Sequence, residues 1–426
     1  MKDFKIHIIE LGPIKDASIQ LAPLMIFTGE SSLGKSYVNF LSYYVFDLFG
    51  NNGFGRFFIP KIEGKQWKDK QLKFSFTVSE MRSWISEDAR KFMSDLLAFP
   101  DLVCNVDFMF DIDGGDSISV IVRDDGLLNK NDAEDGLREI SVEVTGIGVF
   151  RTLSFNSLQY SISNSVARLL SGTLFEKMFV GAYLLPPGRT SLISNSFSVK
   201  KMVSNTGMYD RFLHDYDSLQ NPGFRFRQQK ENNQFFVSQI KRLIHGDVIN
   251  EKDETYLLLD NGNRVPMSAA ASSIRELSPL LFWIKNKNIE LSSVCLEEPE
   301  AHAHPDMQYG IADLLASCVN KGAFLQITTH SDYLLTRINQ LIKLYQFKQN
   351  NPDKFEESIF VRNKRQILNP QNIKAYYFSF SDEKGHVLIK EQDLSEGIPF
   401  DSFRDAILRQ IEFDDNLKQL TGDDDK

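Results

Sequence analysis

The sequence has few cysteines, no long apolar run and no excess of positive charge. Its three cysteines, Cys104, Cys295 and Cys318, stand far apart, so no CxxC pair supplies the spacing of a zinc site. A sparse and odd cysteine count is typical of a reducing compartment. No stretch reaches the roughly 18 apolar residues of a membrane-spanning helix, and the N-terminus lacks the apolar core of a signal peptide. These absences predict a cytoplasmic protein without a membrane partner.

The formal net charge of the 426 residues is −9, which excludes a generally basic protein that coats nucleic acid. A local basic groove is not excluded, because electrostatic steering depends on how charge is distributed. Apolar residues make up 42% and charged residues 25% of the chain, as in ordinary globular proteins. A chain of this length and composition is expected to form two or three domains, or one large domain with an insertion.

The segment Gly29–Glu30–Ser31–Ser32–Leu33–Gly34–Lys35–Ser36 has the GxxxxGKS spacing of a phosphate-binding loop. An apolar strand pattern at 24–28 precedes it, and an apolar helix pattern begins at Tyr37. The glycines allow the backbone to turn successive amides toward a phosphate. Lys35 then faces the terminal phosphates, and the Ser36 hydroxyl can ligate Mg²⁺. The segment predicts binding of ATP with Mg²⁺; the alternative is a chance match in a surface turn.

Two adjacent carboxylates, Glu297 and Glu298, close the apolar run 293–296. In a protein with a phosphate loop, such a strand is expected to lie beside that loop. We assign Glu297 to the metal ion and Glu298 to the attacking water, which it would orient or deprotonate. The alternative is a solvated surface pair.

Two further features carry candidate chemistry. His330 follows the apolar run 323–328, where it can hydrogen-bond the γ-phosphate or the attacking water; the alternative is a structural histidine. Ser272 and Ser273 open a predicted helix at 272–283, and small hydroxyl residues at a helix start form an anion site. The alternative for the two serines is a plain helix N-cap.

The remaining patterns place these motifs on a framework of strands and helices. After residue 290, strands alternate with helices at 307–319 and 333–347, which implies a parallel sheet. Residues 50–150 instead predict an antiparallel sheet with a helix. Its strands are expected at 72–78, 118–122 and 140–144, its helix at 80–98, and turns at 113–115 and 124–126. Helices are also expected within 155–180, 205–245 and 399–420, and closing strands at 374–390.

The four motifs, in this order, resemble the ABC-type ATPase heads of the SMC, RecF and overcoming-lysogenization-defect group. The stretch 12–17 (GPIKDA) looks like the N-terminal segment of that group, and "ASSIREL" at 271–277 looks like its signature motif. The stretch "LEEPEAHAHP" at 296–305 is similar to its Walker B segment and D-loop, and "TTHSDYLL" at 328–335 is similar to the segment that carries its switch histidine. The resemblance implies an α/β fold, with a central, mostly parallel sheet, N-terminal antiparallel strands and an inserted α+β and helical region.

The resemblance also implies a division of the chain. Residues 1–50 and 240–426 would form the ATPase head, and residues 51–240 an insertion, with an antiparallel sheet at about 70–150 and a helical segment. The likeness covers residues 1–50 and roughly 240–340 and is weak between them.

Heads of this group sandwich two nucleotides between two protomers. The resemblance therefore implies a homodimer or higher homo-oligomer in which Ser272 and Ser273 meet the γ-phosphate held by a second copy, with 301–305 at the interface. His302 and His304, two residues apart within that segment, favour packing or interface roles over metal binding. Arg189 closes a stretch similar to the "YLPxxR" of these heads, where it either approaches the nucleotide or forms a structural ion pair.

Two departures from the group's pattern stand out. The usual Walker B aspartate is Glu297 here, and the usual Leu-Ser-Gly-Gly signature is absent, with no glycine in 268–277. The Q-loop glutamine has no clear counterpart, and Gln159 is the candidate.

The resemblance finally suggests a role. Overcoming-lysogenization-defect proteins carry a Toprim nuclease after the head, but only about 86 residues follow Gln340 here. We therefore expect a separate effector protein, a nuclease or toxin, regulated by this chain as the ATP-dependent sensor of an antiviral system similar to the PtuA and AriA types. One alternative is a RecF-like repair ATPase that binds DNA, and another is a nucleotide-bound scaffold with little hydrolysis. The candidate DNA contacts are Arg225, Arg227, Lys230, Lys241 and Arg242. The alternative is that these basic residues form a solvated face.

The acidic stretch 423–425 could mimic a metal-binding cluster, but its position favours a solvated tail or an expression scar.

Overall fold

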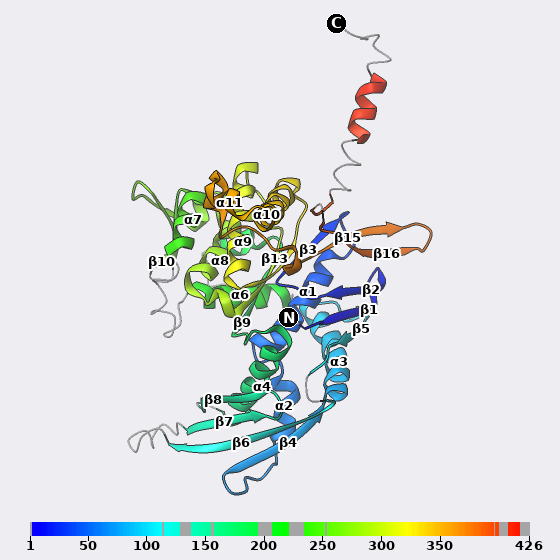
Figure 1. The fold of residues 1–426 in the computed structure, drawn as a ribbon, viewed down its shortest axis with the longest axis vertical. Helices are drawn as coiled ribbons and strands as arrows, with labels where there is room; N and C mark the ends of the chain where they lie inside the picture. The colour runs from blue at the N-terminus through cyan, green and yellow to red at the C-terminus, as the bar shows by residue number, and fades with distance from the viewer. Residues whose placement is uncertain are drawn as a thin grey trace.

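A computed structural model describes residues 2–112, 115–127, 138–154, 157–194, 207–220, 234–251, 254–395, 397–399 and 408–417. Its centre is a nine-stranded sheet in the order β5-β1-β2-β16-β15-β3-β14-β13-β9 (Figure 1). In that order the strands are Cys104–Met109, Lys5–Leu11, Ile14–Gln20, His386–Glu391, Ile373–Ser381, Leu24–Gly29, Phe324–Thr328, Ser292–Glu297 and Gly181–Leu185.

The sheet is mixed, with more parallel than antiparallel pairs. Strand β3 pairs in parallel with β14 and β15, β13 pairs in parallel with β14 and β9, and β16 pairs in parallel with β2. The antiparallel pairs are β1 with β2, β1 with β5, and β15 with β16. The predicted α/β class, with a mostly parallel sheet and N-terminal antiparallel strands, is confirmed.

Helices cover both faces of this sheet, and β3 shows why. Met25 and Phe27 point into one core together with α1 (Lys35–Gly50), whereas Leu24 and Ile26 point into a second core with α8 (Ser272–Asn286), α9 (Pro305–Lys321) and α10 (Asp332–Asn350). Every residue of β3 is buried. A strand that meets water on neither face reads as a continuous apolar run rather than an alternating one, which is the pattern seen at 24–28.

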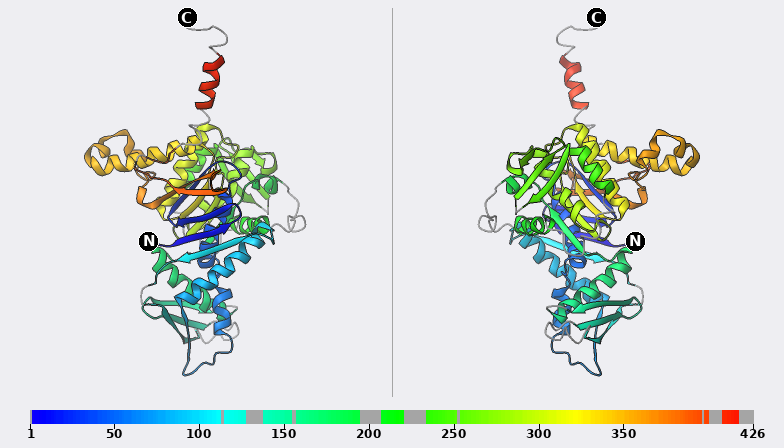
Figure 2. Two further views of the ribbon diagram at one scale, coloured as in Figure 1. Left: turned by 90° about the vertical axis from the view of Figure 1, so that its right-hand side faces the viewer. Right: turned by 90° about the vertical axis from the view of Figure 1, so that its left-hand side faces the viewer.

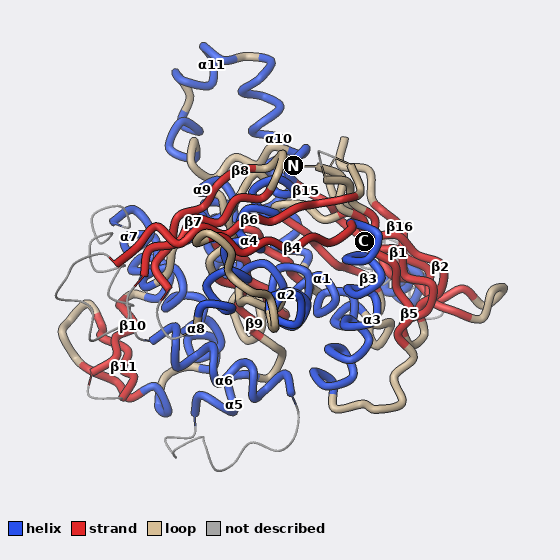
Figure 3. Tube along the Cα trace, turned by 90° about the horizontal axis from the view of Figure 1, so that it is seen from below, coloured by secondary structure: helices blue, strands red, loops and turns tan. Residues whose placement is uncertain are grey.

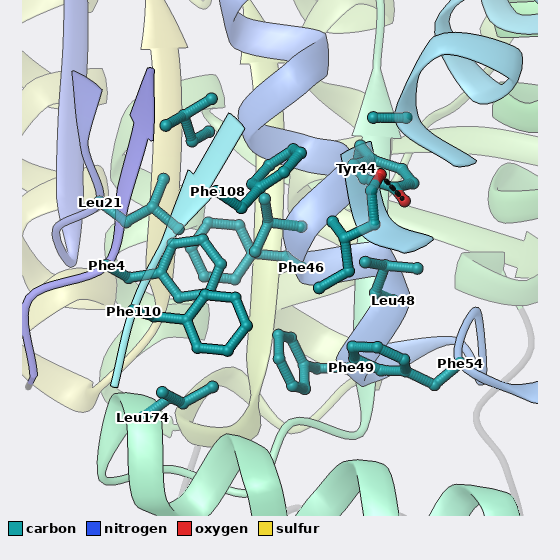
Figure 4. Packing of buried hydrophobic residues seen from close by; sticks show 14 of the residues in the cluster. Phe4, Leu21, Tyr44, Phe46, Leu48, Phe49, Phe54, Phe108, Phe110 and Leu174 are labelled. Atoms are coloured by element: carbon teal, nitrogen blue, oxygen red, sulfur yellow. Dashed lines mark hydrogen bonds between the residues drawn. The ribbon is translucent and has the colours of Figure 1, made fainter. Parts of the chain in front are cut away.

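The core beside α1 is unusually aromatic (Figure 4). Phe4 of the chain start stacks on Phe110 with ring centroids 4.8 Å apart, and Phe46 and Phe49 of α1 both contact the ring of Phe175. These rings tie the N-terminal strands, α1 and α4 (Leu158–Phe175) into one cluster. The phosphate-loop helix is therefore held rigidly along most of its length.

A smaller antiparallel sheet lies below the large one in Figure 1, with α2 (Gly55–Ile62) and α4 against it. Its order is β4-β6-β7-β8. These strands are Gln71–Thr77, Ser117–Leu127, Arg138–Val144 and Gly148–Ser154. The helix predicted after its first strand is α3 (Val78–Leu97), which Thr77 and Glu80 start with a reciprocal capping box.

Two details differ from the expectation for this region. The turn predicted at 124–126 is wrong: these residues lie inside β6, where a bulge lets Gly126 adopt a φ of +107° and donate its amide to Asp124 Oδ1 at 3.1 Å. Strands β5 and β9 also fall within residues 51–240, yet they belong to the large sheet. The proposed division of the chain into head and insertion stays a prediction.

Further α-helices are α5 (Arg189–Ser194), α6 (Gly207–Gln220), α7 (Gln234–Ile244) and α11 (Pro352–Glu357). A three-stranded sheet is formed by β10 (Gly246–Glu251), β11 (Glu254–Leu259) and β12 (Arg264–Pro266). The helices predicted at 272–283, 307–319 and 333–347 are confirmed as α8, α9 and α10. The helix expected at 399–420 is seen at 408–417, and its remaining residues lie outside or at the edge of the described part. Within the described ranges, no helix combines the length and apolar character that a membrane span requires.

Candidate functional site

The motifs meet because three parallel strands end at the same edge of the large sheet. Glu297 on β13 lies opposite Thr328 on β14, and Thr328 lies opposite Phe27 on β3, two residues before the phosphate loop. The expectation that the carboxylate strand lies beside the phosphate loop needs one correction. Strand β14, which ends before His330, lies between β13 and β3, so Glu297 reaches the loop through α1 instead of through a neighbouring strand.

The phosphate loop depends on its two glycines. Gly29 has a φ of +121°, and a Cβ there would lie 2.2 Å from the carbonyl oxygen of Phe378 on β15. Gly34 has a φ of +88°, and a Cβ there would lie 3.0 Å from Ile14 Cδ1, in the strand that follows the Gly12-Pro13 turn. A side chain at Gly29 is therefore excluded by both conformation and space, whereas one at Gly34 would be strained by its conformation and would require Ile14 to move.

The rest of the loop is open toward solvent. Glu30, Ser31 and Ser32 are exposed, and Leu33 is half-buried. Helix α1 begins after Gly34, which supplies no side-chain cap to its first amides. Amides that lack a side-chain acceptor at a helix start form an anion site in this type of loop. Tyr37, also predicted to contact the nucleotide, is half-buried and packs on the hydrophobic core.

Lys35 is folded back onto the loop. Its ammonium donates to the carbonyl oxygens of Gly29 at 3.2 Å and Glu30 at 2.5 Å. Burial lowers the pKa of Lys35, and the charges of Glu297 and Glu298 oppose that shift. The cation is thus held at the loop by backbone carbonyls, which a bound phosphate could replace.

Glu297, the buried last residue of β13, is hydrogen-bonded by polar side chains of α1. The Ser36 hydroxyl donates to its Oε2 at 2.5 Å, and Asn39 Nδ2 donates to its Oε1 at 2.6 Å. Burial raises the pKa of Glu297, and these hydrogen bonds partly offset the shift. The carboxylate and hydroxyl oxygens are hard donors of the kind that Mg²⁺ binds, and Asn39 Oδ1 is buried without a hydrogen-bond partner. The residues present fit a Mg²⁺ ion held by Ser36 and Glu297.

Glu298 and His330 stand on the two strand ends next to this cluster. Glu298 has a left-handed φ of +44°, and its amide donates to the Thr328 carbonyl at 3.2 Å. A left-handed glutamate costs energy that the surrounding structure must supply, and such strain is common at functional sites. Burial, followed by the charge of Lys35, lowers the pKa of His330. The imidazole is therefore neutral near pH 7 and can both donate and accept.

Sequence reasoning missed two residues here. Glu300 is buried; its Oε1 accepts from the Thr329 hydroxyl at 2.7 Å and from the His330 amide at 2.8 Å, and its Oε2 has no hydrogen-bond partner. Burial raises the pKa of Glu300. Asn39 is the other residue, and its spacing from Lys35, one helical turn, was the available signal. For Glu300 the signal was a third carboxylate in the same short motif.

Arg189 forms the structural ion pair, the second of the two roles considered for it. Its side chain is 0% exposed. Nη1 lies 3.1 Å from Glu276 Oε1 and donates to the carbonyl of Glu297 at 2.9 Å, while Nε donates to the carbonyl of Glu276 at 2.9 Å. This side chain therefore joins α8, which carries Ser272 and Ser273, to the end of the carboxylate strand.

The two serines do not cap α8, so the plain N-cap alternative is wrong. Ala271 is the N-cap residue and supplies no side-chain bond. The Ser272 hydroxyl accepts from Arg275 at 3.1 Å. Within the described residues, no hydrogen bond joins Ser272 or Ser273 to the phosphate loop of the same chain, and a role toward a second copy stays a prediction.

The other candidates have local contacts of their own. Gln159 is near the start of α4, where it accepts from the Ser157 hydroxyl at 3.2 Å. His304 is the N-cap of α9 and accepts from the Asp306 amide, whereas His302 has a left-handed φ. Over the described parts of the chain, no three His, Cys, Asp or Glu side chains are grouped to hold a metal ion.

Most of the candidate DNA contacts cannot be placed. Lys241 and Arg242 lie in the last turn of α7. Arg225, Arg227 and Lys230 lie outside the described residues, as does the acidic stretch 423–425.

Residues 197–335 match the family of AAA ATPase domains. This range includes α8, the carboxylate strand and His330, and the match supports an ATPase of the AAA type. No curated protein sequence matches the chain.

Three solved structures show a distant overall likeness. The first is an SMC head bound to the C-winged helix domain of ScpA, with 10% identity and a TM-score of 0.38, covering 93% of this chain and 98% of that chain. The second is the SMC head domain from Thermotoga maritima, with 11% identity and a TM-score of 0.36, covering 92% of this chain and 100% of that chain. The third is an SMC head domain with an extended coiled coil bound to the C-terminal domain of ScpA, derived from Pyrococcus furiosus, with 10% identity and a TM-score of 0.37, covering 96% of this chain and 99% of that chain.

Proposed function

We propose that this chain binds ATP with Mg²⁺ at residues 29–36 and hydrolyses it. The observation that carries the proposal is the contact of Ser36 and Asn39 with Glu297, which joins the phosphate-loop helix to the carboxylate strand. Glu298 and His330 stand on the adjoining strand ends. A loop that matched the motif by chance would not be expected to contact a buried carboxylate about 260 residues away in the sequence.

Each residue has a role that follows from its position. The loop amides and Lys35 bind the phosphates, after Lys35 leaves the carbonyls of Gly29 and Glu30. Ser36 and Glu297 would hold Mg²⁺, which when bound would supply positive charge to the phosphate oxygens. Glu298 accepts a proton from the attacking water, and the neutral His330 donates a hydrogen bond to the γ-phosphate or the water.

We further propose that the site is completed by a second copy. Ser272 and Ser273 are the first two residues of α8, whose first turn has no side-chain cap, so their amides can donate to a phosphate oxygen. The Arg189 link from α8 to the Glu297 carbonyl would transmit that contact to the carboxylates of the same chain. Dimerisation and hydrolysis are coupled in this scheme.

The test uses Glu298→Gln and Lys35→Ala in the full chain, with the surface change Glu63→Gln as the control. Loss of a general base typically costs about 10²–10⁴-fold in rate, so Glu298→Gln should bind a fluorescent ATP analogue normally yet hydrolyse ATP at least 100-fold more slowly. Lys35→Ala should weaken binding itself. An unchanged hydrolysis rate in Glu298→Gln refutes the catalytic assignment, and unchanged affinity in Lys35→Ala refutes the binding site.

The regulatory role is also a proposal and rests on the sequence resemblance. We propose that ATP-dependent states of this chain control a separate nuclease or toxin in antiviral defence. Co-purification with the product of the neighbouring gene tests it, with and without ATP. Failure to associate under either condition refutes it. Salt-sensitive DNA binding without an effector would favour the RecF-like alternative, and nucleotide binding without turnover the scaffold.

A further inference from the structure

The outer part of α10, together with α11 and a following 3₁₀ turn (η6, Ile359–Asn363), projects from the body as an arm, here defined as residues 343–365 (Figures 2 and 3). Phe355 is fully buried within it, and the Lys348 ammonium lies 5.7 Å from the centre of its ring. The arm is thus internally packed. Its tip nevertheless exposes three consecutive apolar side chains, Ile359, Phe360 and Val361, with Ile359 71% exposed.

The helix at 408–417, here called the terminal helix, also projects from the body (Figures 1 and 2). It exposes Leu408, Ile411 and Phe413, the last by 67%. These exposed apolar side chains offer a contact surface to another element.

The two elements carry opposite charge. The arm has six basic and three acidic side chains, a net charge of +3, whereas the terminal helix has one basic and three acidic side chains, a net charge of −2. Lys354 and Arg362 are exposed on the arm, and Asp414 and Asp415 on the helix. Each element thus offers apolar side chains beside charges that attract those of the other.

The chain leaves the body close to the base of the arm. Asn339, in the middle of α10, accepts from the Ile398 amide at 2.6 Å and donates to its carbonyl at 2.9 Å. Gln346 donates to the carbonyl of Ser395 at 3.1 Å. Residues 395 and 398, which precede the terminal helix in the sequence, therefore lie against α10 near the base of the arm. Within one chain the terminal helix and the arm point in different directions (Figure 2).

We propose that the terminal helix of one copy packs on the tip of the arm of a second copy. If the exchange is reciprocal, two copies form a closed dimer with two such contacts; if it is not, the contact is heterologous and extends to a ring or filament. The surfaces involved are separate from the phosphate loop. The contact is therefore independent of the nucleotide-dependent interface proposed above, and either can fail without the other.

Cross-linking between chains tests the proposal directly. Glu357→Cys places a thiol beside the apolar tip, and Asn416→Cys places one on the terminal helix; the three native cysteines are buried. The two variants are mixed and treated with a short bis-maleimide. We expect a product of twice the chain mass from the mixture, and none from a mixture in which Asn416→Cys is paired with Asn261→Cys, a thiol on the distant β11–β12 turn. No mixed product, or only an intrachain product when both cysteines share a chain, overturns the proposal.

Charge reversal gives a second readout that requires no cross-linker. Lys354→Glu with Arg362→Glu on the arm, or Asp414→Lys with Asp415→Lys on the helix, should weaken self-association by about ten-fold or more at low salt, since like charges then face each other. The chain carrying all four changes should regain it. Self-association is measured by light scattering in the absence of nucleotide, with Lys68→Glu and Lys70→Glu as the control. Equal association of all variants, or no rescue in the fourfold variant, refutes the contact.

Lys35→Ala serves to separate the two proposals. It should weaken nucleotide binding and leave the cross-link between residues 357 and 416 unchanged. Loss of the cross-link in Lys35→Ala would contradict an arm contact that is independent of nucleotide.

Discussion

Replacing Arg189 with Met should destabilise the protein strongly, because it leaves Glu276 charged and buried. Removing one partner of a buried ion pair typically costs about 3–5 kcal/mol. Arg189 is fully buried, and Glu276 is only 2% exposed. The carbonyls of Glu297 and Pro186 also lose a donor. We therefore expect the free energy of unfolding to fall by about 4 kcal/mol, a large share of the roughly 5–15 kcal/mol that stabilises most proteins.

The matched control is Arg264→Met. Arg264 pairs with Glu251 at 2.5 Å, but both side chains are about half exposed. Exposed pairs contribute about 0–1 kcal/mol, so this variant should unfold close to the wild-type midpoint. The assay is urea unfolding followed by tryptophan fluorescence, since Trp283 lies fully buried in α8.

A double replacement separates stability from positioning. Arg189→Met with Glu276→Met removes both charges, and apolar substitutes for a buried pair are often neutral or stabilising. The double variant should therefore be more stable than Arg189→Met alone. Its rate of ATP hydrolysis should be lower than that of the wild type, because the hydrogen bond from residue 189 to the Glu297 carbonyl is still missing. The reasoning is refuted if Arg189→Met unfolds at the same urea concentration as Arg264→Met.

Three further predictions concern the site. Gly29→Ala should abolish ATP binding in a filter or fluorescence assay, because its Cβ would lie 2.2 Å from the Phe378 carbonyl oxygen; normal affinity would contradict the assigned loop geometry. Burial raises the pKa of Glu297, so the native state binds the Glu297 proton more tightly than the unfolded state does. As the pH rises from the ordinary carboxyl pKa through the raised pKa, ionisation of Glu297 therefore destabilises the native state. In EDTA, Glu297→Gln should therefore gain thermal stability over wild type as pH rises through that window, and a pH-independent difference would refute this. Glu300→Ala should reduce kcat by up to about 100-fold through misplacement of His330, with the affinity for ATP unchanged; a change in affinity alone would show that Glu300 acts elsewhere.

The local elements were predictable because their signals are local. The run 24–28 followed by the glycine-rich loop predicted β3 and the start of α1, and the apolar runs before Glu297 and His330 predicted β13 and β14. Each of these strands is buried on both faces, so its sequence is continuously apolar. Turn chemistry was less reliable. Asp124–Gly126 has the residues of a turn, but pairing with β7 keeps the segment within a bulged strand.

The arrangement of these elements was not predictable to the same extent. Nothing in residues 104–109 or 181–185 shows that they become edge strands of the large sheet, since both pair with segments distant in sequence. Likewise, the partners of Arg189 come from α8 and β13, about 90 and 110 residues later in the chain. Contacts of this kind depend on the tertiary fold, and a single sequence carries no local trace of them.

The strand order of the large sheet has a consequence for how the protein is made. Strand β3 pairs with β14 and β15, whose residues follow it by about 300 and 350 positions. At about 5–20 residues per second, the ribosome needs roughly 15–60 s to deliver the first of these neighbours. During that interval β3 has an apolar sequence and no strand beside it, a state prone to aggregation. Synthesis must therefore pass β15, which ends at Ser381, before β3 has both of its neighbouring strands.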